Sequence, residues 1–159
     1  MLSEQQLAER AADEVANGAT VRLGPGLPAP VTERLAPRST QEQGDVVVLA
    51  AEQVSPAGDV VVGDASAAEL ARAAERVVVV MSHRAPDGAP RLVRHCEGEH
   101  VVRGVVSRVL TDLAVIDVGP DGFVVRELAP QVSARDVQRQ SEPTLLAGPD
   151  LKPIEVRDD

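Results

Sequence analysis

The chain has almost no aromatic side chains: a single phenylalanine stands among its 159 residues, with no tyrosine and no tryptophan. Aromatic rings therefore cannot fill the core, and valine, leucine, isoleucine and alanine have to do so. These residues, above all the β-branched ones, suit flat strands packed between helices. A chain of this length buries about 68–70% of its unfolded surface, which is enough for one domain with a single core.

Basic residues and long apolar runs are scarce as well. The chain has 16 Lys and Arg against 25 Asp and Glu, so no basic face is left to displace counterions from a phosphate backbone, and we expect no nucleic-acid partner. No apolar run approaches the ~20 residues of a spanning helix, and the opening MLSEQQLAERAADEV is acidic without an apolar leader. Cys96, the single cysteine, cannot form an intramolecular disulfide, which favours a reducing compartment. We expect a soluble, cytoplasmic protein with no membrane partner.

The stretch on which the rest of the chain packs contains an apolar run, a turn, a second β-rich run and a hairpin. The apolar run is typical of a strand buried on both faces, as in parallel sheets. The hairpin closes through a Gly-Pro-Asp-Gly turn. In order, these parts are Val77–Met81, Asp87-Gly88, Val105–Val118 and Phe123–Leu128.

Helices and further strands flank this stretch. Ser3 caps an amphipathic helix with Gly18 as its stop, Asp64 or Ser66 caps a second helix, and Ser133 a third. Other elements are expected at Thr20–Leu23 (strand), Val31–Leu35 (helix), Asp45–Val54 with Asp59–Val62 (hairpin) and Pro143–Leu146 (edge strand). The sequence thus predicts an α/β fold. We expect one compact domain over residues 1–147, with a mostly parallel mixed sheet flanked by helices, and an acidic tail at 148–159.

Several short motifs resemble one known family in the right order. They are VVVVMSH, DGAPRLVRHC, RGVVSRVLTDLAVIDV and VRELAPQVSARDV. They are similar to the closing half of the B-type subunit of 3-oxoacid CoA-transferases, in the class I CoA-transferase family, and the resemblance runs from Asp45 onward and over Leu7–Leu35. It implies an A-type partner in a heterodimer or heterotetramer, and an acyl-CoA or β-keto acid as substrate, with no cofactor besides that thioester. Such a partner could cover apolar surface left by the short sheet.

A glycine loop between the expected strand at Thr20–Leu23 and the next helix has the layout of a ligand cradle. The resemblance implies a substrate-binding role for Gly24, Gly26 and Pro28, which match the family's V-N-L-G-I-G-I-P run. Glycine admits positive φ and has no Cβ to block close approach of a ligand. A Gly-Pro-Gly-Leu-Pro run can equally be a tight turn.

The family's catalytic segment is the main departure. In the family, the glutamate of an S-E-N-G motif attacks the acyl-CoA thioester, but this chain is shortened and has only the polar loop Pro37–Gly44 there. Glu42 is the nearest catalytic candidate, against the alternative of a solvated loop glutamate. Glu52 is the other catalytic candidate. It either points to solvent by strand alternation or is partly buried as a general base.

Two further positions have expected substrate-binding roles. Gly63 stands where the family has G-M-G-G-A-M-D-L, whose backbone helps stabilise the thioester oxyanion, but Ala65 and Ser66 replace the middle glycines. Losing such a donor costs about 2.7–4 kcal/mol at the transition state. His83 follows Val77–Met81 at the strand end where ligands gather in α/β sheets, and it also suits closing the loop.

We expect no metal site, because His95, Cys96 and His100 match no zinc spacing. Two functional hypotheses remain open. The chain is either a B-type subunit of an active heteromeric enzyme, with chemistry that can have diverged from CoA transfer, or a degenerate, non-catalytic subunit that stabilises or regulates an A-type catalytic partner. The nucleophilic glutamate of the family is not identifiable in it, so the sequence alone does not decide whether the chain is itself an enzyme.

Overall fold

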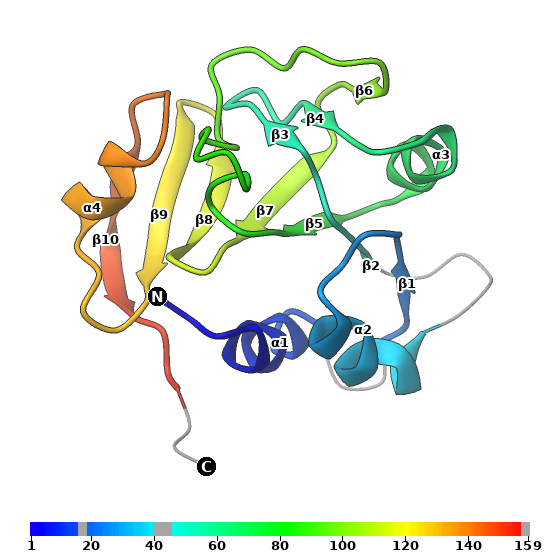
Figure 1. Cartoon of the computed structure of the whole chain (residues 1–159), viewed down its shortest axis with the longest axis horizontal. Coiled ribbons are helices and arrows are strands. Elements are labelled where there is room, and N and C mark those ends of the chain that lie inside the picture. Colours follow the sequence, from blue (N-terminus) through cyan, green and yellow to red (C-terminus); the bar gives the residue numbers. More distant parts are fainter. Residues whose placement is uncertain (16–18, 40–45, 157–159) are drawn as a thin grey trace.

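The computed structural model describes residues 1–15, 19–39 and 46–156 (Figure 1). The helical elements are α1 (Glu4–Ala12), α2 (Ala29–Leu35), the 3₁₀ turn η1 (Ala36–Arg38), α3 (Ala65–Ala73) and α4 (Ala134–Arg139). The strands are β1 (Val21–Leu23), β2 (Val46–Leu49), β3 (Gln53–Val54), β4 (Val60–Val61), β5 (Val77–Val80), β6 (Val101–Val102), β7 (Val106–Leu110), β8 (Ala114–Gly119), β9 (Gly122–Leu128) and β10 (Leu146–Pro153).

Seven strands form the central sheet in the order β1-β2-β5-β7-β8-β9-β10. The first four of these run parallel to one another, β8 is antiparallel to both β7 and β9, and β10 is parallel to β9. This confirms the predicted mostly parallel, mixed sheet. The carboxyl ends of these parallel strands lie at the same edge of the sheet, which is where ligands bind in open α/β sheets.

The sheet is buried on both faces, as its runs of valine predicted. Alternate residues of β2 and β5 enter two different core clusters: Val47 and Val79 pack on the side of α3, whereas Val48 and Val78 pack on the side of α1 and α2. Figure 1 shows α1 and α2 below the sheet and α3 with the small sheet above it. All four residues of each of these two strands are buried. Continuous apolar runs of this kind are typical of strands covered on both faces.

One predicted strand is divided between two sheets. We expected Asp45–Val54 to be continuous, but β2 ends at Leu49 and the chain bends at Glu52 before β3 begins. β3, β4 and β6 form a separate antiparallel sheet, and the predicted β3–β4 hairpin is confirmed. The Glu52 amide donates to the carbonyl of Val61 at 2.8 Å, so from this point the chain pairs with β4 instead of with the central sheet.

The predicted helix starts are correct. Ser3 accepts a hydrogen bond from the Gln6 amide, Asp64 from the Ala67 amide and Ser133 from the amide three residues on, each at the first turn of its helix. The first helix ends at Ala12, and the predicted stop at Gly18 lies outside the described residues.

The expected end of the chain is corrected by the structure. The last strand runs over Leu146–Pro153 rather than Pro143–Leu146, so it extends into the segment expected to be a tail. Ile154 is buried and its amide donates to the carbonyl of Leu128 at 2.7 Å, which fixes this strand against β9.

The apolar surface expected for a partner is not found. Within residues 1–15, 19–39 and 46–156, only Met1 and Leu146 are exposed large hydrophobics.

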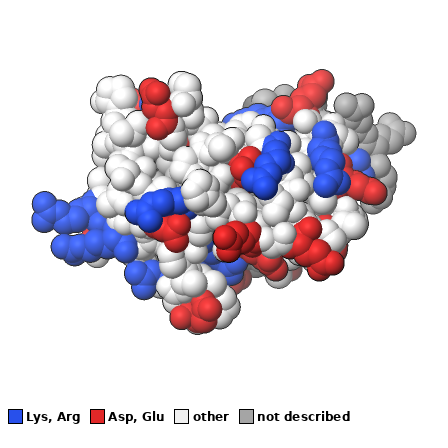
Figure 2. Space-filling view, turned by 90° about the horizontal axis from the view of Figure 1, so that it is seen from above, with Lys and Arg blue, Asp and Glu red and all other residues white. Residues whose placement is uncertain are grey.

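Charged groups on the outside are mixed. Figure 2 shows acidic and basic side chains in small separate groups on one face of the molecule, rather than one continuous basic surface. No helix in the part of the chain that the structure describes is long and apolar enough to cross a membrane.

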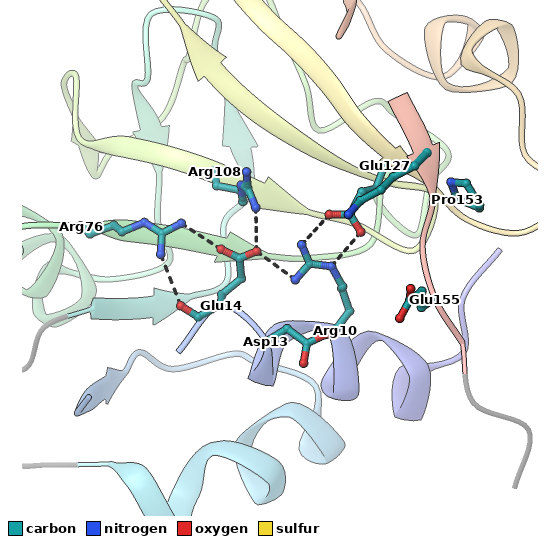
Figure 3. Close-up of a pocket in the computed structure, with 9 residues that line it drawn as sticks. Arg10, Asp13, Glu14, Arg76, Arg108, Glu127, Pro153 and Glu155 are labelled. Carbon is teal, nitrogen blue, oxygen red and sulfur yellow. Dashed lines mark hydrogen bonds and ion pairs between the residues drawn. The ribbon is translucent and has the colours of Figure 1, made fainter. Parts of the chain in front are cut away.

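A cluster of ion pairs holds α1 against the sheet (Figure 3). The Glu14 carboxylate, with a side chain only 5% exposed, accepts from Arg10 at 2.9 Å, and from Arg76 and Arg108 at 2.8 Å each. Arg10 also binds Glu127 through two hydrogen bonds. Burial opposes ionisation of Glu14, but the hydrogen bond and charge of Arg108, with Arg76 and Arg10, outweigh it and lower its pKa.

This cluster borders a cavity of about 460 Å³, but its charged groups pair with one another. Its inner arginines are paired with Glu14 in the turn after α1 and with carboxylates of β8 and β9, because Arg10 also binds Glu127 and Arg108 also binds Asp117. Mutual pairing leaves these groups little capacity for a ligand, so we assign the cluster to structure rather than to chemistry.

Replacing Glu14 with alanine should destabilise the fold. The Glu14→Ala variant would leave three partly buried guanidinium groups short of a partner, and we expect its free energy of unfolding to fall by about 3 kcal/mol. Asp13→Ala is the matched control, because Asp13 is exposed and has no ion pair among the described residues, and its effect should stay within about 0.5 kcal/mol. Urea unfolding measures both. Equal effects of the two substitutions would contradict the assignment.

Candidate functional site

A second cavity, of about 410 Å³, lies where β2 leaves the central sheet. Four segments far apart in the sequence converge on it: the loop after β1, the end of β2 with its bend, the start of α3, and the loop after β5. The residues that line it are Pro25, Gly26, Ala50, Ala51, Glu52, Gly63, Asp64, Ala67 and Arg91. It therefore brings together three of the residues selected from the sequence, namely Gly26, Glu52 and Gly63.

Two glycines shape the loop after β1. Gly26 has a φ of +81°, a left-handed conformation that side chains disfavour. A Cβ on Gly24 would lie 2.7 Å from the Cβ of Leu49, so only glycine lets the loop pass this close to β2. Gly24 also donates to the carbonyl of Val48 at 2.8 Å. Gly26 thus borders the cavity and Gly24 supports it from behind, whereas Pro28 is the N-cap of α2 and is not among the lining residues.

Gly63 and Asp64 form the wall at the start of α3. The Asp64 carboxylate accepts from the Ala67 amide at 2.8 Å, which caps the helix. A Cβ on Gly63 would meet no atom of the described part of the chain within 4 Å, so sterics there do not require a glycine at this position. The oxyanion role that the resemblance implies for Gly63 stays a prediction.

Of the two candidate carboxylates, only Glu52 can be placed. Glu52 is exposed, as one of the two sequence interpretations predicted. It lies at the bend after β2 and is one of the residues that line the cavity. Its side chain has no hydrogen bond or ion pair to another described residue, so it is available to a ligand. Glu42 lies outside the described residues.

Arg91 is the lining residue that sequence reasoning missed. Its Nη1 donates to the carbonyl of Ala51 at 3.2 Å, and its Nε is buried without a hydrogen-bond partner among the described residues. Its backbone is fixed on both sides, since its amide donates to His83 and its carbonyl accepts from Val54. Nothing in the local sequence DGAPRLVRHC distinguishes Arg91 from Arg94, because its place depends on how the loop folds back onto β2 and β3.

His83 is buried and holds the amide of Arg91 through its own carbonyl, but it is not among the residues that line the cavity. Its Nδ1 lies 3.0 Å from the Thr111 hydroxyl and its Nε2 2.8 Å from the Ser141 hydroxyl. Ser141 donates its own proton to the carbonyl of Val137, which assigns the Nε2–H tautomer to His83. These contacts fit the loop-closing role, and the substrate-binding role stays a prediction.

The residues considered for a metal are His95, Cys96 and His100. Cys96 is buried, its thiol lies 3.4 Å from the carbonyl of Asp59, and burial raises its pKa. His95 is exposed and adjacent to it in sequence. Among the described residues, no group of three or more His, Cys, Asp or Glu side chains is placed to hold a metal ion.

Similar proteins have been found by sequence. The beta subunit of a probable coenzyme A transferase of Bacillus subtilis is 36% identical over 107 residues, which cover 62% of this chain and 49% of that protein. The B subunit of a 3-oxoadipate CoA-transferase of Pseudomonas putida is 34% identical over 107 residues, with 61% and 50% covered. The chain thus spans about half the length of the curated relatives it matches. No family model matches it.

Solved structures show the same fold. The decarboxylase AibA/AibB matches with a TM-score of 0.73 at 15% identity, over 98% of this chain and 89% of that chain. Glutaconate coenzyme A-transferase from Acidaminococcus fermentans matches with a TM-score of 0.70 at 14% identity, over 98% and 89%. An acyl-CoA transferase from Escherichia coli matches with a TM-score of 0.74 at 17% identity, over 96% and 43%.

The fold is therefore that of the CoA-transferases. Within that class, the sequence is similar to the B-type subunit, which confirms the resemblance seen in its motifs.

The buried histidine predicts a pH dependence of stability. Burial lowers the pKa of His83 to about 4. The charge of Asp112 opposes this shift, and the charge of Arg84 adds to it. In the unfolded chain its pKa is about 6.5, so the unfolded state takes up the proton first as the pH falls. Stability should thus decrease between pH 6.5 and 4, by up to about 3 kcal/mol from this residue.

Unfolding measured across this range in His83→Gln should show a weaker pH dependence than in the original protein. His95→Gln, at an exposed position, is the control and should retain the original slope. If His83→Gln also retained that slope, His83 would not be held neutral in the fold.

Proposed function

We propose that this chain is a B-type subunit of a heteromeric CoA-transferase-superfamily enzyme that acts on an acyl-CoA or β-keto acid. The observation that carries this proposal is the convergence of Gly26, Glu52, Gly63 and Arg91 on one cavity at the end of β2. A glycine loop, a carboxylate with no partner among the described residues, a helix start and an arginine can together approach, orient and react with an acyl group.

An A-type partner would complete the site. The similar proteins from Bacillus subtilis and Pseudomonas putida are named as the beta and B subunits of CoA-transferases. The cavity here is made by one chain of about half their length, and a second chain would close it against water. A heterodimer and a heterotetramer both satisfy this arrangement.

The chemistry of this chain centres on Glu52. A carboxylate that no described residue neutralises can take a proton from a substrate carbon or from water as a general base. The S-E-N-G glutamate of the family is missing from the sequence, so Glu52 and Glu42 are the carboxylates of this chain that we propose for transfer. The CoA thioester enters as a substrate and not as a resident cofactor. Because the fold also occurs in a decarboxylase, it is compatible with reactions other than transfer.

A non-catalytic role is the second candidate. It is favoured by Ala65 and Ser66, which stand where the family has glycines beside the oxyanion, and by the missing glutamate segment. In that case the A-type partner would contribute every reacting group, and this chain would stabilise or regulate it.

Purification of the tagged chain from its native cells tests the proposal. We expect an A-type CoA-transferase-like protein to co-purify, and the complex to turn over members of a panel of acyl-CoA thioesters. A stable complex without activity on thioesters or β-keto acids would favour the non-catalytic role. Recovery of the chain alone would contradict the heteromer.

Substitution of the carboxylates then assigns the chemistry. In the assembled complex, Glu52→Gln should lower kcat at least about 100-fold, the usual contribution of a general base, with little change in KM. Glu69→Gln is the control, since it is an exposed glutamate of α3 outside the cavity lining. Unchanged rates in both Glu52→Gln and Glu42→Ala would remove the carboxylates of this chain from the mechanism.

A further inference from the structure

The His83 ring connects three parts of the chain that are far apart in the sequence. Its own loop follows β5. Its Nδ1 lies 3.0 Å from the hydroxyl of Thr111, at the turn between β7 and β8, and its Nε2 lies 2.8 Å from the hydroxyl of Ser141, just after α4. The His83 amide also donates to the carboxylate of Asp112 in that turn, at 2.8 Å. The loop after β5 is therefore held to both elements through this one residue.

The hydroxyl of Thr111 determines which ring nitrogen carries the proton. Its oxygen accepts the amide of Leu113 at 3.1 Å and the amide of Ala114 at 3.2 Å, which occupies both lone pairs. The hydroxyl proton is then left for Nδ1 of His83, so Nδ1 has to be the unprotonated nitrogen. The same Nε2–H tautomer follows from the contacts of Ser141. Hydrogen bonds on both sides of the ring thus select its neutral form.

A proton on Nδ1 would have no acceptor among the described residues. It would face the hydroxyl proton of Thr111, whose oxygen could accept it only by giving up one of its two amides. His83 is 1% exposed and Thr111 is 0% exposed, so neither is open to solvent. A charged ring with an unmade hydrogen bond is costly in the interior. We therefore expect the protonated ring to leave this position.

The charged groups on the surrounding elements act in both directions. Asp112, in the turn between β7 and β8, favours the protonated ring, whereas Arg84, in the same loop as His83, opposes it. After α4, the carboxylate of Glu142 accepts the amide of Arg94 at 2.9 Å. The burial of the ring outweighs the charge of Asp112, so the neutral form is the one that the folded chain favours.

We propose that His83 is a proton-sensitive latch, whose protonation releases the loop over residues 83–94 from α4 and from the turn between β7 and β8. The release would reach the candidate cavity, because the carbonyl of His83 accepts the amide of Arg91 at 3.2 Å and Arg91 lines that cavity. The amide of Glu142 also donates to the carbonyl of Leu92 at 3.0 Å, so the segment after α4 would separate with it. This inference does not depend on the reaction proposed for the cavity.

The direction of the pH effect follows from the two states of the ring. In the released loop the pKa of His83 is about 6.5, and in the closed loop burial lowers it to about 4, so the released form takes up the proton first as the pH falls. The latch is therefore closed above pH 6.5 and loosens between pH 6.5 and 4. Between pH 7 and pH 5 the equilibrium constant for opening should rise about 20-fold.

Hydrogen–deuterium exchange of the full chain at pH 7 and pH 5, corrected for intrinsic exchange rates, tests the latch. The opening constants of the amides of Arg91, Arg94 and Glu142 should rise about 20-fold at pH 5. Their exchange should not depend on urea below the unfolding transition, because a local opening exposes little surface. No rise, or exchange of these amides only together with those of Val48 and Val78 in the core strands, would overturn the proposal.

Variants at the ring position identify the titrating group. His83→Gln should remove this rise in opening between pH 7 and pH 5, because a neutral amide takes up no proton in this range. His95→Gln, at an exposed position in a neighbouring segment, is the matched control and should retain the rise. An undiminished rise in His83→Gln would assign the opening to another group and overturn the latch.

NMR titration of the His83 ring separates the hydrogen bond at Nδ1 from burial. Thr111→Val removes the donor to Nδ1 and should raise the pKa of His83, whereas Thr111→Ser keeps the hydroxyl and should retain the original pKa. Ser141→Ala removes the acceptor at Nε2 and should not raise it. A raised pKa in Ser141→Ala would show that the ring responds only to looser packing and would overturn the proposal, even if Thr111→Val failed to fold.

Discussion

The end of β2 is the point on which the rest of this structure depends. β2 and β5 pair in parallel and are buried on both faces, so their position is fixed by two core clusters at once. At Ala50 the chain can no longer pair with the central sheet, and it turns to join β4 instead. The cavity exists because of this departure, since the glycine loop, the start of α3 and Arg91 all pack around the vacated edge.

Two polar systems hold the framework around that edge. On the α1 side, Glu14 with its three arginines fixes the first helix to β5 and β7. On the opposite end of β5, the His83 ring and its two hydroxyl partners secure the loop that carries Arg91. Both systems are internally satisfied, which makes them supports. Glu52 has no side-chain partner among the described residues and Arg91 has no carboxylate partner among them, and this difference separates the candidate cavity from the rest of the polar interior.

Much of the fold could be predicted from the sequence because its signals are local. The runs of valine, the caps Ser3, Asp64 and Ser133, and the hairpin turn at Gly122 each determine structure within a few residues. The break at Ala50 could not be predicted, because it results from competition between two sheets for the same chain. The strand β10 was placed too early for a similar reason, since it is fixed by contacts with β9 rather than by its own composition.

The site was predictable in part. Gly26 and Gly63 were selected through the resemblance and Glu52 as a carboxylate in an otherwise apolar strand, and the three line one cavity. Arg91 and its support by the His83 carbonyl follow only from tertiary contacts. A long-range property such as an unpaired charge has no signature in the local sequence.

Hydrogen–deuterium exchange of the complex purified from native cells, with and without an acyl-CoA substrate, tests the central claim most directly. If this cavity receives the acyl group, the substrate should slow exchange at residues 24–27, 50–53, 63–67 and 91, and leave the Glu14 cluster unchanged. Protection elsewhere in the complex, with none at these four segments, would contradict the account.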